Sequence, residues 1–155
     1  MTRPTQLGEG YRGPSGRTGY LLRQLMHAFH VTQEQGLRPF DLTSPQFGAL
    51  YVLDLEPGLS AADLARAMGV TPQAVGLLVS TLEKEQLVRR SPHPTHGRVL
   101  EIYPTDEGLG RLRAAMPFIT ELEDRLLTGL DAAERSLVKR WLVQAAASVG
   151  GGPAL

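Results

Sequence analysis

The chain has 155 residues and a mass of 16.8 kDa, which is the size of one domain. Hydrophobic residues make up 42% of it, enough for one core, and its formal net charge is zero. It has no cysteine, which excludes disulfides, thiolate zinc sites and cysteine nucleophiles. We expect a cytoplasmic protein, because the N-terminal segment lacks the apolar stretch of a secretory signal and no apolar run approaches the ~20 residues of a membrane span.

The zero net charge hides an uneven distribution. Residues 1–40 carry five arginines and two acids, and residues 60–100 carry five basic and three acidic residues. Residues 41–59 and 101–155 carry the compensating excess of acids. Local patches, rather than whole-chain averages, attract phosphate groups. The N-terminal and middle parts of the chain therefore remain candidates for contact with nucleic acid.

The first part of the chain predicts a flexible arm followed by a helix. Residues 1–17 are rich in glycine, proline and arginine and contain little to bury, which is typical of a mobile segment. In residues 18–35, Leu21, Leu25 and Phe29 recur at every fourth position, so they line one face of a helix. Gly36 and Pro39 are expected to end this helix.

The middle of the chain predicts a helix-turn-helix. Three successive helices each begin at a side chain that can cap the first turn, and these capping residues are Thr43, Ser60 and Thr71. Only Gly69 and Val70 separate the last two helices, which is the spacing of a helix-turn-helix. The small and apolar residues expected to face inward there are Leu64, Ala65, Met68, Val70, Val75, Leu78, Val79 and Leu82.

A β-hairpin and two further helices complete the predicted order. Two short strands, over residues 88–90 and 99–103, flank a run of turn-forming residues. Thr105 then caps a long helix that contains Pro117, which is expected to kink it. Asp131 and Glu134 form a capping box for the last helix. The apolar face of that helix consists of Leu137, Val138, Trp141, Leu142 and Ala145.

The predicted fold class is mainly α with a small β wing: a winged helix-turn-helix module between dimerisation helices. We expect the following division of the chain: an arm over residues 1–17, a dimerisation helix over 18–40, the winged module over 41–104, dimerisation helices over 105–149 and a tail over 150–155. An amphipathic helix near each end of the chain suits a core shared between two copies.

Three stretches resemble the MarR family of transcriptional regulators: LTSPQFGALYVL, LSAADLARAMGVTPQAVGLLVSTLEKEQLVRR and HGRVLEIYPTDEG. With the flanking helices the resemblance covers about residues 18–149. It implies a homodimer that binds a pseudo-palindromic operator in double-stranded DNA, acts as a repressor, and is released by a small, often aromatic or phenolic, effector. The alternative is a winged-helix module that binds proteins without sequence-specific DNA binding.

The expected DNA contacts lie on the outer face of the fourth helix and on the wing. Gln73 can form two hydrogen bonds to adenine, and Leu77 can contact a thymine methyl group. The resemblance assigns Arg98, in the wing, to the minor groove. The complete expected set is Ser60, Thr71, Gln73, Leu77, Ser80, Lys84, Arg89, Arg90 and Arg98. Capping or plain solvation is the alternative role for each of them.

The sequence departs from the family pattern at four positions in or near this set of expected DNA contacts. The fourth helix has Gly76, Leu77 and Thr81 where relatives often have Thr and Arg, and His96 replaces the aspartate that precedes the wing arginine. The sequence does not decide whether these changes weaken DNA binding or alter its specificity.

The resemblance also places an effector site where the first, second and fifth helices meet the winged module. The expected residues are Arg23, His27, His30, Phe47, Tyr51 and Met116, whose rings, sulfur and cation suit an aromatic carboxylate. Phe47, Tyr51 and Met116 fit a structural core equally well.

The remaining motifs do not predict catalysis or a cofactor. The histidines form two His-x-x-His pairs, His27 with His30 and His93 with His96, but few further ligands lie near them in sequence, so we expect no metal. Residues 8–13 match GxGxxG, but no strand can precede them, so a dinucleotide site is not expected. No nucleophile lies beside a base in the pattern that an enzyme requires.

Overall fold

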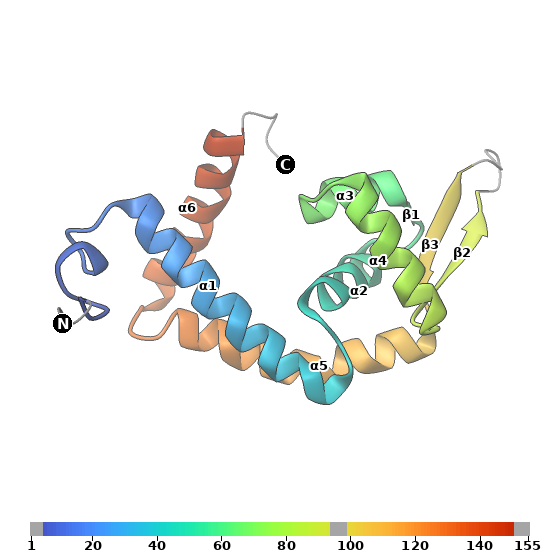
Figure 1. The fold of residues 1–155 in the computed structure, drawn as a ribbon, viewed down its shortest axis with the longest axis horizontal. Helices are drawn as coiled ribbons and strands as arrows, with labels where there is room; N and C mark the ends of the chain where they lie inside the picture. The colour runs from blue at the N-terminus through green and yellow to red at the C-terminus, as the bar shows by residue number, and fades with distance from the viewer. Residues whose placement is uncertain (1–4, 94–98, 151–155) are drawn as a thin grey trace. The chain divides into compact units, whose positions relative to one another are not determined.

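The computed structural model describes residues 5–93 and 99–150 (Figure 1). The fold class is confirmed: the described chain is mainly helical with one small antiparallel sheet. The α-helices are α1 (Thr18–Leu37), α2 (Ser44–Leu55), α3 (Ala61–Met68), α4 (Pro72–Lys84), α5 (Asp106–Leu126) and α6 (Ala132–Gly150). The strands are β1 (Leu59–Ser60), β2 (Val88–Pro92) and β3 (Leu100–Pro104), and the short 3-10 helices are η1 (Gly10–Arg12) and η2 (Arg38–Phe40).

The chain divides into two compact units, one ending at Pro117 and the other beginning at Phe118. The boundary lies inside α5, which continues through Pro117. The first unit contains the helix-turn-helix and the sheet. The second contains the end of α5 and α6, joined to each other by an ion pair between Asp124 and Arg135. Among the described residues, none of the helices combines the length and hydropathy that crossing a bilayer requires.

The predicted capping residues are confirmed, because each accepts a hydrogen bond in the first turn of its helix. Thr43 and Gln46 form a complete capping box at α2. Ser60 and Thr71 accept hydrogen bonds from backbone N–H groups in the first turns of α3 and α4. Thr105 accepts one from the N–H of Gly108 at the start of α5. Asp131 and Glu134 exchange the two bonds of a capping box at α6.

Three features of the N-terminal half differ from the sequence-based expectation. Helix α1 continues through Gly36 to Leu37, whose side chain is fully buried, and this packing outweighs the weak helix propensity of glycine. The arm also contains regular structure: η1 lies within it, and the Arg12 guanidinium donates hydrogen bonds to the Thr5 carbonyl and to Gln24 of α1. Strand β1 was not predicted, since two residues are too short to show an alternating pattern.

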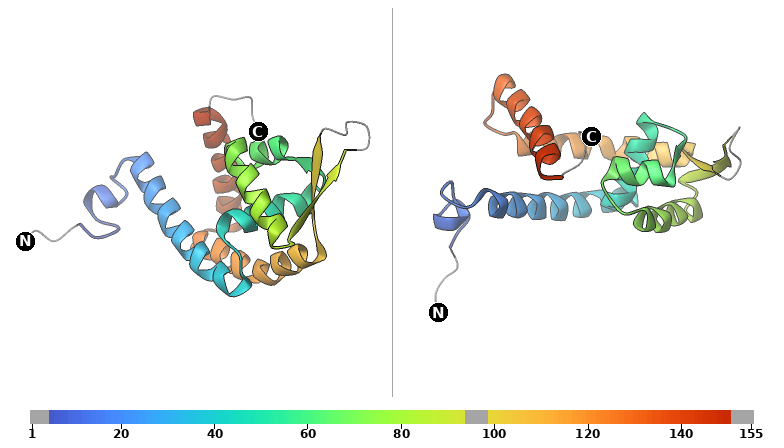
Figure 2. Two further views of the ribbon diagram at one scale, coloured as in Figure 1. Left: turned by 45° about the vertical axis from the view of Figure 1, so that its right-hand side comes forward. Right: turned by 90° about the horizontal axis from the view of Figure 1, so that it is seen from above.

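The sheet has the strand order β1-β3-β2, with both pairs antiparallel. Ile102 of β3 lies opposite Leu59 of β1 and Arg90 of β2, and its side chain is buried in the core. This core joins the helix-turn-helix to the sheet, and its fully buried members include Leu50, Leu53, Leu64, Val75, Leu82 and Leu112. The views in Figure 2 show the β2–β3 hairpin projecting from the helices of this module.

Candidate nucleic-acid interface

The turn between α3 and α4 is fixed by Gly69. Its backbone is left-handed, with φ of 65°, and its N–H bonds back to the carbonyls of Ala65 and Arg66. Leu64, Ala65 and Val75 are buried where the two helices cross, as predicted. The prediction for Val70 is wrong: its side chain is 45% exposed, because the tight turn directs it away from the crossing. Met68 and Leu78 are only half-buried.

The outer face of α4 presents polar groups around one large apolar side chain. Leu77 is 69% exposed, and Gln73, Thr81 and Lys84 are exposed on the same helix. Thr71 accepts a hydrogen bond from the N–H of Ala74 at 3.2 Å, so it caps the helix whatever else it contacts. This exposed face of α4 thus carries three of the predicted DNA contacts, Gln73, Leu77 and Lys84.

A groove of about 630 Å³ runs between the start of α3, the middle of α4 and the hairpin. It brings together three of the predicted DNA contacts, Ser60, Ser80 and Arg90. Each is already engaged within the protein: Ser60 donates to Asp63 at 2.5 Å, and Arg90 donates to Ser80 at 3.1 Å. The hydrogen bond from Ser60, followed by that from Arg66, lowers the pKa of Asp63.

Arg89 lies on the opposite side of the hairpin from Arg90. Its guanidinium lies over the ring of Tyr103, 4.6 Å from the ring centre. The Tyr103 hydroxyl donates a 2.8 Å hydrogen bond to Glu101, and the other oxygen of that carboxylate lies 3.6 Å from His93 Nε2. The bond to Glu101, then burial and the carboxylate charge, raise the pKa of Tyr103 above its ordinary value.

The wing arginine, Arg98, and the substituted position, His96, lie outside the described residues. The insertion of Arg98 into a minor groove therefore stays a prediction. The described residues of the wing base, Arg89 and Arg90, lie within β2, the strand that leads to this segment.

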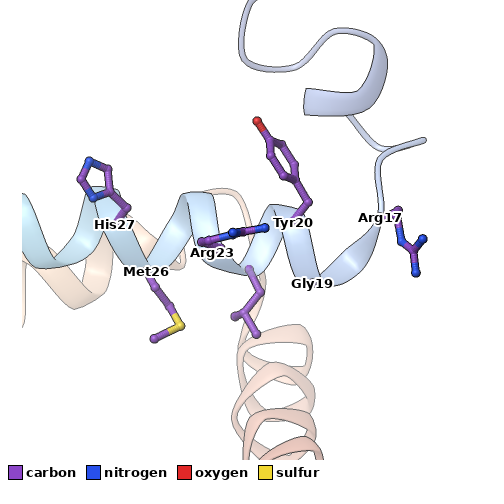
Figure 3. Close-up of a pocket in the computed structure, with 7 residues that line it drawn as sticks. Arg17, Gly19, Tyr20, Arg23, Met26 and His27 are labelled. Carbon is purple, nitrogen blue, oxygen red and sulfur yellow. The ribbon is translucent and has the colours of Figure 1, made fainter.

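The residues predicted for an effector do not all line one site. A hollow of about 880 Å³ on α1 is lined by Arg17, Gly19, Tyr20, Leu22, Arg23, Met26 and His27 (Figure 3). Figure 3 shows Tyr20 and His27 rising from the same side of the helix, with Arg23 between them. The Arg23 guanidinium lies 5.9 Å from the centre of the Tyr20 ring. Of the predicted set, only Arg23 and His27 line this hollow.

The other predicted effector residues lie elsewhere on their helices. Phe47 is buried and stacks on Tyr51, with ring centres 6.3 Å apart. Met116 is half-buried on α5, and His30 is exposed on α1. Sequence analysis missed Tyr20, although its spacing of three and seven residues from Arg23 and His27 places all three on one helical face.

Comparison with known proteins identifies the family of this chain. A sequence profile of the MarR family matches residues 40–99. The HTH-type transcriptional repressor Rv2887 of Mycobacterium tuberculosis is 34% identical over 124 residues, which cover 80% of this chain and 89% of that protein. The chain belongs to the MarR family. Members of the MarR family are transcription regulators and not enzymes, so the expectation that this chain is not an enzyme is confirmed.

Solved structures of MarR-family proteins share this fold. The Staphylococcus aureus MepR–DNA complex is 28% identical with a TM-score of 0.79, covering 85% of this chain and 98% of that one. The complex of Rv2887 from Mycobacterium tuberculosis with salicylic acid is 32% identical with a TM-score of 0.65, covering 85% and 98%. The likeness extends over most of this MarR-family chain, including its helices outside the winged module.

Proposed function

We propose that this MarR-family protein is a homodimeric repressor that binds a pseudo-palindromic operator in double-stranded DNA. The observation that carries the proposal is the exposed face of α4, where Leu77 stands 69% exposed between Gln73 and Lys84, beside a projecting hairpin. A helix of this composition suits the major groove, where amide and apolar side chains meet base edges. The DNA-bound structure of the similar MepR supports this use of the fold.

The apolar helices outside the winged module support the homodimer. On α1, Leu25 is exposed, and on α6 the exposed residues include Leu137, Trp141 and Leu142. Within the described part of α6 no residue is buried. Apolar faces of this size are costly to leave in water, and a second copy covers equivalent faces by symmetry. In such a dimer the two recognition helices would lie about 34–36 Å apart, so they could enter successive major grooves on the same side of the DNA duplex.

Selection from a random duplex library at moderate salt tests the operator proposal. We expect enrichment of a palindrome whose half-sites are about one helical turn apart. Arg98→Ala and Leu77→Ala should each weaken binding to that sequence, while Glu121→Gln, on an exposed part of α5, should leave it unchanged. If no sequence is enriched and the wild-type protein does not bind duplex DNA, the protein is instead an interaction module and the proposal is wrong.

We further propose that the hollow on α1 binds a small aromatic carboxylate that releases the operator. Arg23 supplies a cation, Tyr20 a ring, and His27 a second polar group within one open depression. These are the groups that an aromatic anion requires. The salicylic acid complex of the similar Rv2887 supports this ligand class. A ligand can release DNA only by binding one spacing of the recognition helices more tightly than another.

Salicylate serves as the probe for this site. We expect it to raise the melting temperature of the free protein and to weaken operator binding, and Arg23→Gln to abolish both effects. Arg113→Gln removes the same charge from an exposed position of α5 and should change neither. If Arg23→Gln responds to salicylate like the wild type, the hollow is not the effector site.

A further inference from the structure

Arg90 is directed into the protein although it belongs to the expected set of DNA contacts. In the β2–β3 pair, Arg90 lies opposite Ile102, and Arg89 lies opposite Tyr103. Residues paired across two strands share a face of the sheet, and neighbours on one strand point to opposite faces. Since Ile102 is buried in the core, Arg90 points toward α4, and Arg89 points away with Tyr103.

The Arg90 guanidinium contacts two successive turns of α4. One N–H donates to the Ser80 hydroxyl oxygen at 3.1 Å, and Nε lies 3.5 Å from a carboxylate oxygen of Glu83. Ser80 in turn donates its hydroxyl hydrogen to the carbonyl of Gly76 at 2.9 Å, which leaves its oxygen free to accept. The Arg90 side chain is only 29% exposed. Two of its three guanidinium nitrogens thus contact side chains of α4.

We infer that Arg90 is a positioning residue that fixes the angle between the recognition helix and the wing. Ser80 and Glu83 are its partners on α4, and none of the three needs to contact DNA directly. The inference rests on the proposed DNA binding. Reading an operator requires α4 in the major groove and the wing in the adjacent minor groove at the same time. A fixed angle avoids the ordering cost that a loose hairpin would impose on binding.

This role differs measurably from a phosphate contact. Losing one phosphate contact weakens specific and random duplexes alike and reduces the slope of log K against log salt by about one. Losing a positioning contact weakens the specific complex and leaves that slope unchanged. Removing a residue that couples two structural elements in this way is expected to lower the operator affinity on the order of tenfold.

The decisive variants are Arg90→Gln and Arg90→Lys, measured on the selected operator and on a random duplex across a salt series. Lysine keeps the charge but lacks the planar fork that reaches Ser80 and Glu83 together. We expect both variants to lose about tenfold in operator affinity and less than about twofold on the random duplex, with an unchanged salt slope. Arg113→Gln is the charge-matched control, because it removes the same charge from an exposed position of α5 outside the expected DNA contacts, and it should change neither the operator affinity nor the salt slope.

A double-mutant cycle provides a test that does not depend on charge. Ser80→Ala should reduce operator affinity, and adding it to Arg90→Gln should cause little further loss, because the two residues act through one contact. The inference is overturned if Arg90→Lys restores binding, if the salt slope falls, or if the two losses add fully. Should Arg90→Gln not fold, Arg90→Lys and Ser80→Ala decide alone. If the wild-type protein binds neither duplex, it is the proposed function that fails.

Discussion

The Gln46 side-chain amide donates a 2.8 Å hydrogen bond to the Glu85 carboxylate and so joins the first turn of α2 to the C-terminal end of α4. Gln46 is only 6% exposed. Its carbonyl oxygen accepts hydrogen bonds from the N–H and the hydroxyl of Thr43, at 2.9 and 3.1 Å. One side chain therefore caps α2 and holds the end of the recognition helix.

We predict that Gln46→Ala lowers the free energy of unfolding by about 2 kcal/mol, from the loss of a capping interaction and of a hydrogen bond to a charged group. Urea denaturation measures this change. Gln144→Ala, at an exposed position of α6, is the matched control and should change stability by no more than about 0.5 kcal/mol. Equal effects of the two substitutions would contradict a structural role for Gln46.

Gly108 and Gly110 lie two residues apart on α5. We predict that alanine at these two positions changes the stability of the protein in opposite directions. A Cβ at Gly108 would lie 2.1 Å from the Leu87 carbonyl oxygen, whereas one at Gly110 would have nothing within 4 Å. The Leu87 carbonyl also accepts a hydrogen bond from the N–H of Thr105, so it cannot withdraw freely. Gly108→Ala should destabilise the protein by about 3 kcal/mol, and Gly110→Ala should stabilise it by about 0.5–1 kcal/mol.

Thermal or urea unfolding of both variants checks these signs. A Gly108→Ala protein as stable as the wild type would show that α5 does not approach the Leu87 carbonyl this closely. A destabilised Gly110→Ala protein would show that other atoms pack against Gly110 in the folded molecule.

The sequence predicted those parts of the fold that depend on neighbouring residues. The capping residues Thr43, Ser60 and Thr71 were identified because each acts on backbone only three residues away. Strand β1 was missed because its pairing with β3 joins Leu59 to Ile102, far along the chain. The link between Gln46 and Glu85 was missed for the same reason: no local pattern indicates a contact between residues so far apart in sequence.

For the candidate site, the sequence predicted the face of α4 but not the direction of each arginine. Because an α-helix repeats every 3.6 residues, Val75 and Val79 lie on the buried face of α4 and Leu77 lies on its exposed face. Strand alternation shows that Arg89 and Arg90 point to opposite faces, but not which face meets the helix. That depends on the register of β2 against β3, which places Arg90 opposite the buried Ile102.

The raised pKa of Tyr103 predicts a pH response that Glu101 controls. The Tyr103 hydroxyl donates to Glu101, so ionisation of the phenol breaks this bond and places two negative charges together. Because the folded-state pKa lies above the unfolded value of about 10, this contribution to stability is complete below that pH. It is lost as pH rises through the folded-state pKa.

We expect Glu101→Gln to lower the pKa of Tyr103 and Arg89→Gln to raise it further, since the arginine charge favours the phenolate. Absorbance titration of tyrosinate measures both, and Tyr103→Phe identifies this residue among the four tyrosines. Glu107→Gln, which breaks only an exposed pair with Arg111, should leave the titration unchanged. An unaltered curve for Glu101→Gln would mean that the hydrogen bond does not form in solution.

The single tryptophan provides a reporter for the proposed homodimer. Trp141 is 46% exposed and lies beside the exposed Leu142 on α6. If a second copy covers this face, the emission of Trp141 should shift to longer wavelength as the protein is diluted and the dimer dissociates. Leu142→Glu places a charge in that face, so dissociation should occur at a concentration at least about tenfold higher. Ser136→Glu adds the same charge on the far side of α6 and should leave the transition unchanged. Emission independent of concentration, together with a monomer mass by sedimentation, would show that the α6 face is not a dimer interface.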